Sequence, residues 1–191
     1  NYLMKLTKIV KQIALLNVII FIISYSMEFS FYDQFALFPN GSELFQTHQY
    51  ITHMFLHASP THIIFNMLAF LSFGSNVENF FGSNKFIVFY LLSGLGAAFL
   101  HIIITGSQSP VVGASGAIFG VLLIAAILNP EQKFYLFFIL PIKAKIIIPL
   151  ILISELYFGL MYPTDHIAHF AHIGGSLTGG LFYLGNKFIK K

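Results

Sequence analysis

Three places in this 191-residue chain combine residue types that could carry out chemistry. They are Ser115, His172, and the pair His62 and Asn66, which are four residues apart and so share one face of a helix. A serine hydroxyl becomes a nucleophile when a neighbouring base takes its proton, and histidine has a pKa near neutrality that suits this role. We therefore predict Ser115 as a nucleophile and His172 as its base.

The surroundings of Ser115 favour nucleophilic chemistry over packing. A lone serine in apolar sequence is more often a packing residue bonded to its own backbone. Ser115, however, lies between Gly113 and Gly116, where backbone or substrate can approach closely. It also begins an apolar segment whose free N–H groups would stabilise a developing oxyanion if the segment is helical. His62 and Asn66 could donate hydrogen bonds to the same oxyanion from the opposite side.

Two pairs of small residues indicate how the serine and the histidine could meet. Gly116 and Gly120 follow the serine, and Gly175 and Gly179 follow the histidine, each pair in GxxxG spacing. This spacing is typical of grooves where helices pack closely in membranes. If the two grooves face each other, both side chains project at the same end of one seam. The simpler interpretation of either pair is packing alone.

The composition indicates what must position these residues. Hydrophobic residues make up 57% of the chain and charged residues only 9%, too few to cover a water-soluble surface. A spanning helix needs about 20 residues, so six spans with short loops nearly fill the chain as a single domain over 1–191. The predicted spans are Leu6–Met27, Thr61–Phe81, Phe86–Thr105, Ala114–Leu128, Ile146–Tyr162 and Ile167–Leu184. There are no cysteines, which excludes disulfides, thiol catalysis and Cys-based zinc sites.

The lysines predict the orientation of these spans. All ten basic residues are lysines, and with six spans they fall on one side, which the positive-inside rule makes cytoplasmic. They are Lys5, Lys8, Lys11, Lys85, Lys133, Lys143, Lys145, Lys187, Lys190 and Lys191. Segments 28–60, 106–113 and 163–166 contain none. We expect both termini in the cytoplasm. The net charge of +3 is explained by this topology without nucleic-acid binding.

Two further features concern the N-terminal half. The first span has lysines ahead of an apolar run and could pass for a signal peptide, but its removal would leave the remaining lysines on conflicting sides. Because the chain begins at Asn1, we expect some leading sequence to be missing. Segment 28–60 is long and rich in Phe, Tyr and Leu, so we expect short amphipathic helices in the outer membrane interface.

Histidine spacing raises a metal site as an alternative. His53 and His57 are four residues apart, and His166, His169 and His172 follow each other at intervals of three, so either set could share a helix face. There is no HExxH motif, and no acid lies close enough in sequence to complete a ligand set. We therefore predict no metal and no cofactor.

These motifs together resemble those of the rhomboid family of intramembrane serine proteases. Gly113-Ala-Ser115-Gly116 resembles its GxSG nucleophile motif, and His62-x-x-x-Asn66 its HxxxN motif. The run from Ala171 to Gly179 resembles AHxxGxxxG, and the run from Gly74 to Ser83 resembles GxxxExxxGS. The four motifs occur in the family's order from the second to the sixth span.

The resemblance implies an all-α, six-helix membrane bundle with a long membrane-associated first outside loop. It implies a Ser115–His172 dyad without an acid, and an oxyanion site formed by His62, Asn66 and the Ser115 N–H. Substrates would be single-span membrane proteins cut near the outer membrane face. Gly113, Gly116, Phe119 and Gly175 would shape the site.

Several residues depart from the family pattern or stand outside it. A tyrosine that often stacks on the base is replaced by Phe119, which keeps the stacking but not the hydroxyl. A frequent Trp-Arg pair in the first loop is His48-Gln49. Glu155 falls mid-span, and we interpret it as a neutral, hydrogen-bonded acid rather than a catalytic group. Glu78 is interpreted as a structural anchor for the turn at Ser83.

Two other functions remain as alternatives. A non-catalytic rhomboid-like protein could bind membrane clients, but such relatives typically lack the serine or the histidine. A small metal transporter could explain eight histidines, yet the chain shows no internal repeat. We therefore expect a serine endopeptidase whose partners are transmembrane substrates and the lipid bilayer. The oligomeric state is left open.

Overall fold

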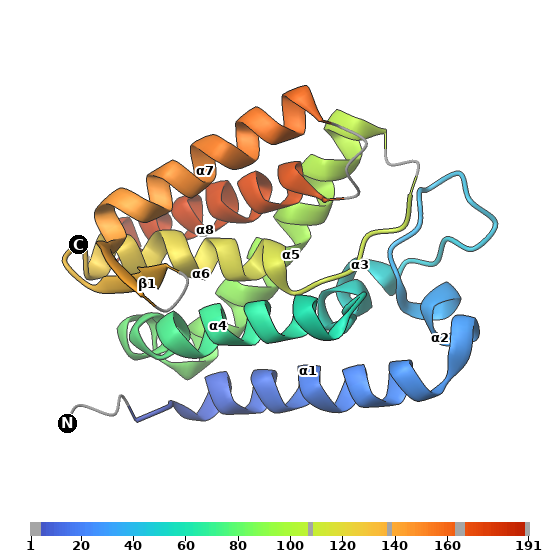
Figure 1. Cartoon of the computed structure of the whole chain (residues 1–191), viewed down its shortest axis with the longest axis horizontal. Helices are drawn as coiled ribbons and strands as arrows, with labels where there is room; N and C mark the ends of the chain where they lie inside the picture. Colours follow the sequence, from blue (N-terminus) through green and yellow to red (C-terminus); the bar gives the residue numbers. More distant parts are fainter. Residues whose placement is uncertain (1–4, 107–108, 137–138, 163–166, 190–191) are drawn as a thin grey trace.

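The chain folds into a bundle of six long helices (Figure 1). The computed structural model describes residues 5–106, 109–136, 139–162 and 167–189. The long helices are α1 (Lys8–Ser26), α4 (Pro60–Phe81), α5 (Ser83–Thr105), α6 (Ser115–Leu128), α7 (Ala144–Met161) and α8 (His169–Ile189). Each corresponds to one predicted segment, with ends that differ by up to five residues. The predicted all-α bundle is confirmed, apart from one short hairpin.

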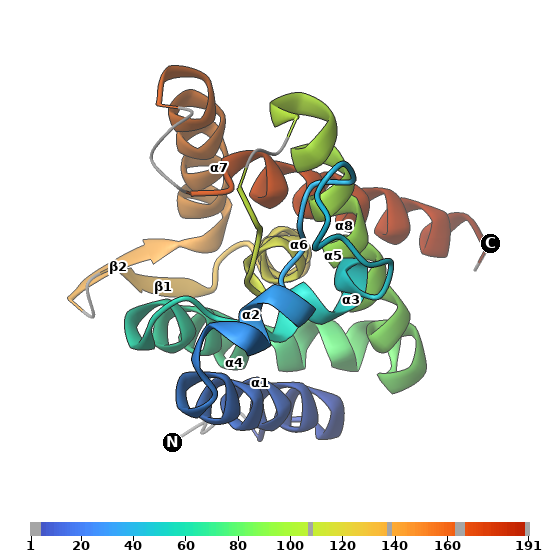
Figure 2. The ribbon, with the colours of Figure 1, turned by 90° about the vertical axis from the view of Figure 1, so that its right-hand side faces the viewer.

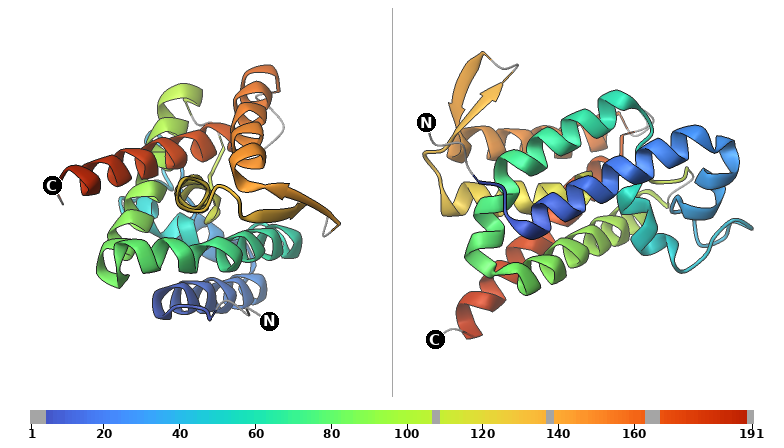
Figure 3. Two further views of the ribbon diagram at one scale, coloured as in Figure 1. Left: turned by 90° about the vertical axis from the view of Figure 1, so that its left-hand side faces the viewer. Right: turned by 90° about the horizontal axis from the view of Figure 1, so that it is seen from below.

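Helix α6 is the centre of the bundle. Seen along its axis, it lies among α4, α5, α7 and α8 (Figures 2 and 3), and it contacts all four. Its interior-facing residues are small or branched, such as Gly120, Val121, Ile124 and Ala125, and all are buried. Helix α1 packs on the outside of α4, away from α6. The element that begins with Ser115 is thus shielded by protein on nearly every side.

The six-span count is not established by helix length and composition. Among the described residues, α1, α5 and α7 are long and apolar enough to cross a membrane. A fourth candidate pairs residues Gln49–Phe55 with α4 across a 91° bend. Helix α6 has 14 residues, or about 21 Å, which is short of a hydrocarbon core of about 30 Å. Helix α8 is long enough but carries histidines, glycines and an asparagine. Helices α6 and α8 pack against other helices of the bundle, so they do not need apolar side chains on every face.

The segment between α1 and α4 contains the predicted short helices. They are α2 (Glu28–Phe35), α3 (Gln49–Thr52) and the 3-10 turn η1 (His53–Phe55). Fully buried Gln49 holds the loop together: its amide donates to the Leu44 carbonyl at 2.8 Å, and its carbonyl accepts from the Phe38 and Gln46 N–H groups, both at 3.2 Å. Gln49, which departs from the family pattern, therefore stabilises this loop through hydrogen bonds to its backbone. Its placement in the membrane interface stays a prediction.

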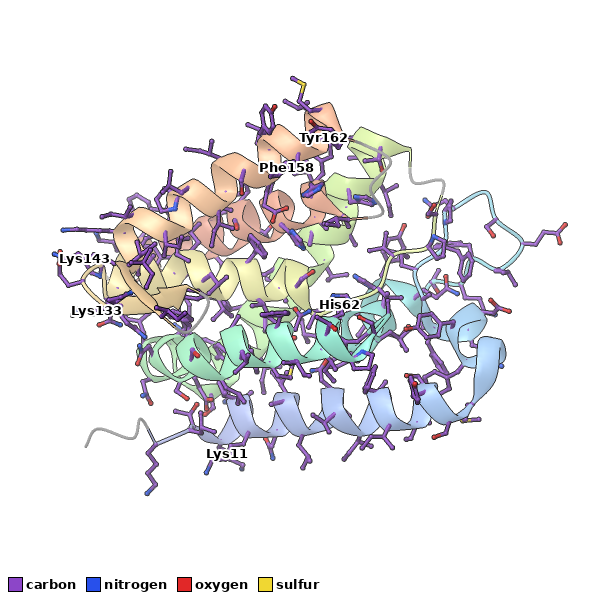
Figure 4. The ribbon with its side chains drawn as sticks, in the orientation of Figure 1. Lys11, His62, Lys133, Lys143, Phe158 and Tyr162 are labelled. Carbon is purple, nitrogen blue, oxygen red and sulfur yellow. The ribbon has the colours of Figure 1, made fainter. Side chains whose placement is uncertain are left out.

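The described lysines gather at the end of the bundle opposite the start of α6. Figure 4 shows Lys11, Lys133 and Lys143 at that end, whereas His62 lies farther along the bundle. Lys85 at the start of α5 donates to Asn186 near the end of α8 at 2.9 Å. This common end agrees with the one-sided distribution in the sequence.

A short hairpin that the sequence did not predict also lies at this end. Strands β1 (Lys133–Leu136) and β2 (Leu140–Lys143) pair antiparallel between α6 and α7. Exposed Glu131 forms ion pairs with Lys143, at 2.7 Å, and with Lys145. Hydrogen bonds from these lysines lower the pKa of Glu131 to about 2.

Buried Glu78 joins three elements at the same end. Its carboxylate accepts from the Ile9 and Val10 N–H groups of α1 at 3.2 and 3.0 Å, and from the Ser83 hydroxyl at 2.7 Å. The Thr7 hydroxyl donates to it as well. These N–H groups belong to the first turn of α1, where no helical partner exists. The predicted bond to the turn at Ser83 is confirmed, and the anchor also caps α1.

Candidate active site

Ser115 is the first residue of α6, one residue later than the predicted start. The chain reaches it through Gly113, whose φ of +130° is a conformation that residues with a Cβ rarely adopt. The Gly113 N–H donates to the His53 carbonyl at 2.9 Å, which ties the turn to η1. The partly exposed Ser115 hydroxyl therefore projects from a fixed turn at a helix N-terminus, where donors and dipole favour negative charge.

The structure brings Ser115 and His172 together. Ser115 Oγ lies 2.8 Å from His172 Nε2, across the contact between α6 and α8. His172 lies in the first turn of α8 and is 9% exposed. The pairing predicted from the sequence is therefore present as a hydrogen bond, while the catalytic role of the pair stays a prediction.

The glycine pairs explain how the two helices come so close. A Cβ on Gly175 would lie 1.8 Å from the Gly116 carbonyl oxygen, which is impossible without moving the backbone. A Cβ on Gly120 would lie 2.9 Å from the Gly175 carbonyl oxygen, and one on Gly179 would lie 3.0 Å from the Gly120 Cα. The expectation that the two grooves face each other is confirmed. Gly116 follows the serine directly, and Gly175 follows the histidine by three residues. The backbone contact between these two glycines therefore sets the distance between Ser115 and His172.

Phe119 fixes the plane of the His172 ring. The two rings are parallel to within 1°, with centroids 4.2 Å apart. Phe119 lies one turn after Ser115 on α6, so the same helix carries both the serine and the ring that stacks on its partner. The predicted stacking is confirmed.

His62 lies beside the serine across Gly113. A Cβ built on Gly113 would be 3.0 Å from His62 Nε2 and 3.6 Å from Ser115 Oγ, so both atoms border the space that the glycine leaves open. The Ala58 N–H donates to His62 Nδ1 at 3.4 Å. In a neutral ring the proton is then on Nε2, which makes the nitrogen that borders this space a donor.

Asn66 lies one turn farther along α4. It is buried, and its amide donates to the His62 carbonyl of its own helix at 2.9 Å. The structure records no bond from Asn66 to Ser115. His62 thus lies beside the serine. Asn66 lies one turn away on the same face of α4 and is bonded to the His62 backbone.

Sequence reasoning missed the acid at this site. Glu155 of α7 has one carboxylate oxygen 2.8 Å from His172 Nδ1 and 2.6 Å from His169 Nδ1. The resemblance implied a dyad without an acid, whereas in the structure an acid contacts His172. Glu155 is 17 residues from His172 in the sequence, so chain position alone did not relate them. His166, which the sequence grouped with His169 and His172, lies outside the described residues. The available signals were a costly charge in mid-span and two histidines three residues apart on one face.

The same three side chains form a possible metal-ligand set that the sequence did not predict. The ligand atoms of Glu155, His169 and His172 all lie within 4.8 Å of one another, so an acid does complete a possible set. The two nitrogen–oxygen distances, 2.6 and 2.8 Å, are hydrogen-bond distances. Two ligands on one tetrahedral zinc ion lie about 3.3 Å apart, given bonds of 2.0–2.1 Å. The present arrangement thus fits shared protons better than a shared ion.

The other histidine pair is not a ligand set. His53 begins η1, and its Nδ1 donates to the Gln49 carbonyl at 2.8 Å. His57 follows η1 and packs edge-on against His62, with ring centroids 5.0 Å apart. Only the first of the two therefore lies on the predicted loop helix.

Comparison with known proteins adds an independent finding. Residues 44–186 match the Rhomboid domain family model. Rhomboid protease GluP of Bacillus subtilis is 37% identical over 135 residues, covering 69% of this chain and 24% of the relative. RHOMBOID-like protein 6, mitochondrial, of Arabidopsis thaliana is 36% identical over 135 residues, covering 71% and 41%.

A mammalian relative extends the range of organisms. The presenilin-associated rhomboid-like protein, mitochondrial, of Mus musculus is 32% identical over 145 residues, covering 72% of this chain and 38% of the relative. The chain thus matches between a quarter and two fifths of the length of these relatives. With the family model covering most of the sequence and apolar helices in the fold, the chain belongs to the rhomboid family of integral membrane proteins.

Proposed function

We propose that this protein is an intramembrane serine protease in which Ser115 is the nucleophile and His172 the general base. The observation that carries the proposal is the 2.8 Å contact between Ser115 Oγ and His172 Nε2 at the start of α6. A nucleophile within hydrogen-bond reach of a base that is itself held by a third group is the general signature of covalent catalysis. The relative named Rhomboid protease GluP supports the same reaction class.

The reaction follows from the placement of the two groups. His172 Nε2 takes the hydroxyl proton as Ser115 Oγ bonds to the carbonyl carbon of the substrate, and the carbonyl electron pair moves onto its oxygen. The tetrahedral intermediate collapses, the C–N bond breaks, and the amine leaves with the proton from His172. Water then attacks the acyl-enzyme by the same route and frees Ser115.

The negative oxygen of the intermediate needs donors in a site with little water. The Ser115 N–H lies at the N-terminus of α6, and His62 Nε2 borders the same space across Gly113. We assign the Ser115 N–H, His62 Nε2 and the Asn66 amide of α4 to the oxyanion site. Such donors are preorganised, so they stabilise the charge without rearranging during the reaction.

Substrates and orientation are part of the proposal. His62 lies farther along the bundle than the labelled lysines, which supports a site nearer the outer face if the lysines are cytoplasmic. Single-span membrane proteins cut near that face are the substrate class, and residues 1–191 act as one domain in a bacterial inner membrane.

Because the chain has no cysteine, Glu43→Cys and Asn84→Cys test the orientation. An impermeant thiol reagent should label only the first from outside, and labelling of the second would contradict this topology.

The decisive experiment measures cleavage of a model single-span substrate by the purified protein in detergent. The wild-type protein should cleave it, and Ser115→Ala should abolish cleavage while the protein stays folded. A fluorophosphonate probe, which reacts with activated serines, should label the wild type but not this variant. Cleavage by Ser115→Ala would refute the mechanism. A wild-type protein that retains substrate without cleavage would indicate the non-catalytic alternative.

A further inference from the structure

Glu155 links the proposed base to a third helix. The residue lies in the middle of α7, a helix with no other acidic or basic side chain between Lys145 and its end. Its Oε2 contacts His172 Nδ1 at 2.8 Å, and His172 Nε2 contacts Ser115 Oγ at 2.8 Å. A continuous path of two hydrogen bonds therefore runs from α7 through α8 to α6.

The direction of the bonds follows from what each atom can donate. Two ring nitrogens contact the same Glu155 oxygen, so we take this residue as an ionised acceptor and not as the neutral acid expected from the sequence. An ionised carboxylate has no proton and only accepts, so the proton between Glu155 and His172 belongs to Nδ1. The neutral His172 ring then has a bare Nε2, which accepts the Ser115 proton. In serine proteases with an acid, that acid holds the imidazole in this tautomer and stabilises the imidazolium that forms.

Phe119 and Glu155 restrain different motions of the His172 ring. The parallel stack with Phe119 fixes the plane of the ring but leaves it free to turn within that plane. Hydrogen bonds at its two nitrogens, to Glu155 on one edge and Ser115 on the other, fix the remaining rotation. Neither restraint replaces the other.

His169 holds the carboxylate in turn. Its Nδ1 lies 2.6 Å from the same Glu155 oxygen, and the residue is buried with its ring stacked near Phe158. Two imidazole donors on one carboxylate oxygen offset part of the cost of keeping an acid among apolar helices. These two contacts hold the Glu155 carboxylate in this position before substrate binds.

We propose that Glu155 is a positioning residue that completes a Ser115–His172–Glu155 triad, with His169 fixing its carboxylate. The inference rests on the proposed function, since it needs Ser115 and His172 to be nucleophile and base. Glu155 takes no proton during the reaction. It sets the tautomer of His172 and stabilises its positive charge while that charge exists.

The test compares Glu155→Gln with wild type by fluorophosphonate labelling and by kcat and KM on a single-span substrate. The glutamine keeps the size of the side chain but removes the charge and can present an N–H to His172. Labelling and kcat should fall about 10²–10⁴-fold with little change in KM, as for third members of other triads. Glu155→Asp keeps the charge on a shorter side chain and should recover part of the rate.

Ser154→Ala is the matched control. Ser154 is the neighbour of Glu155 on α7, and its hydroxyl donates only to the Ile151 carbonyl of the same helix, at 2.7 Å. This variant should label and cleave at the wild-type rate. Thermal unfolding of each variant in the same detergent separates lost chemistry from lost structure.

Each outcome decides the matter. Wild-type labelling of folded Glu155→Gln overturns the triad and leaves the Ser115–His172 proposal intact. No labelling or cleavage by the wild type overturns the proposed function, and the triad with it. If Glu155→Gln does not fold, Glu155→Asp decides, since a wild-type rate there shows that the contact is not needed. Activity that EDTA abolishes and added zinc restores would overturn the triad in favour of a metal site.

Discussion

Two glutamates inside this bundle, Glu78 (buried) and Glu155 (partly buried), have different kinds of partners. Glu78 accepts from two backbone N–H groups and two hydroxyls, none of which contacts the proposed site. Glu155 accepts from two imidazole rings, and one of them contacts Ser115. Both oxygens of Glu78 and one oxygen of Glu155 accept hydrogen bonds, which lowers the cost of keeping these acids among apolar helices. The first fastens helices to each other, whereas the second is connected to a group that can gain and lose a proton.

This difference predicts that variants near Glu155 change rate and variants at Glu78 change stability. The largest effect should come from His172→Gln, which removes the base. We expect a loss of about 10⁴-fold or more in cleavage, with an unfolding temperature close to that of the wild type. His62→Gln is the matched variant, and it should keep partial activity because His62 acts as a donor. Equal loss in the two variants would contradict the assigned roles.

Asn66→Ala tests the oxyanion assignment on α4. Removing one such donor in other proteases costs about 10²–10³-fold in rate. We expect kcat to fall by this amount with little change in KM, and His62→Ala to behave alike. If Asn66→Ala and His62→Ala both cleave at the wild-type rate, these residues only pack, and the oxyanion donors lie elsewhere.

Glu78→Ala should affect stability without changing the chemistry of the site. The substitution leaves the Ile9 and Val10 N–H groups and two hydroxyls without their acceptor in a buried place. We expect the free energy of unfolding in detergent to fall by about 3 kcal/mol, as for other buried donors left unpaired. The folded fraction should label with fluorophosphonate at the wild-type rate. Ser72→Ala, on the exposed face of α4, is the control.

The smallest effect is expected at Phe119. Phe119→Leu removes the ring that stacks on His172, and such contacts are worth about 0.5–1.5 kcal/mol beyond burial. The labelling rate should fall about 2- to 10-fold. Phe119→Tyr keeps the ring and should stay near wild type. A loss in Phe119→Leu as large as that in Glu155→Gln would mean that stacking, and not the acid, holds the base.

The sequence predicted the parts of the site that depend on local pattern. Glycine spacing identified the seam between α6 and α8 because only glycines permit backbone contact, as Gly175 and Gly116 make. His62 and Asn66 followed from the helical period. The predicted helices also appear in order, because long apolar runs are the strongest signal of all.

What the sequence could not predict depends on the rotation of one helix against another. Glu155 precedes His172 by 17 residues and an intervening loop, so no periodicity relates them. The apolar composition of α7 also gives no clear face, and Pro149 interrupts its pattern. The hairpin formed by β1 and β2 was missed because lysines at its ends indicated only a cytoplasmic loop.

Helix α7 contributes an acid to the site while lying largely exposed on the outside of the bundle, with 22% of its apolar stretch buried. Its 18 residues span about 27 Å, slightly less than an average hydrocarbon core. A bilayer of different thickness changes the preferred tilt of such a helix. Tilting α7 would move Glu155 relative to α8, and in the proposed triad His172 would then lose the partner that sets its tautomer. The acyl-chain length of the surrounding lipid would thereby become a variable in the proposed proton transfer at Ser115.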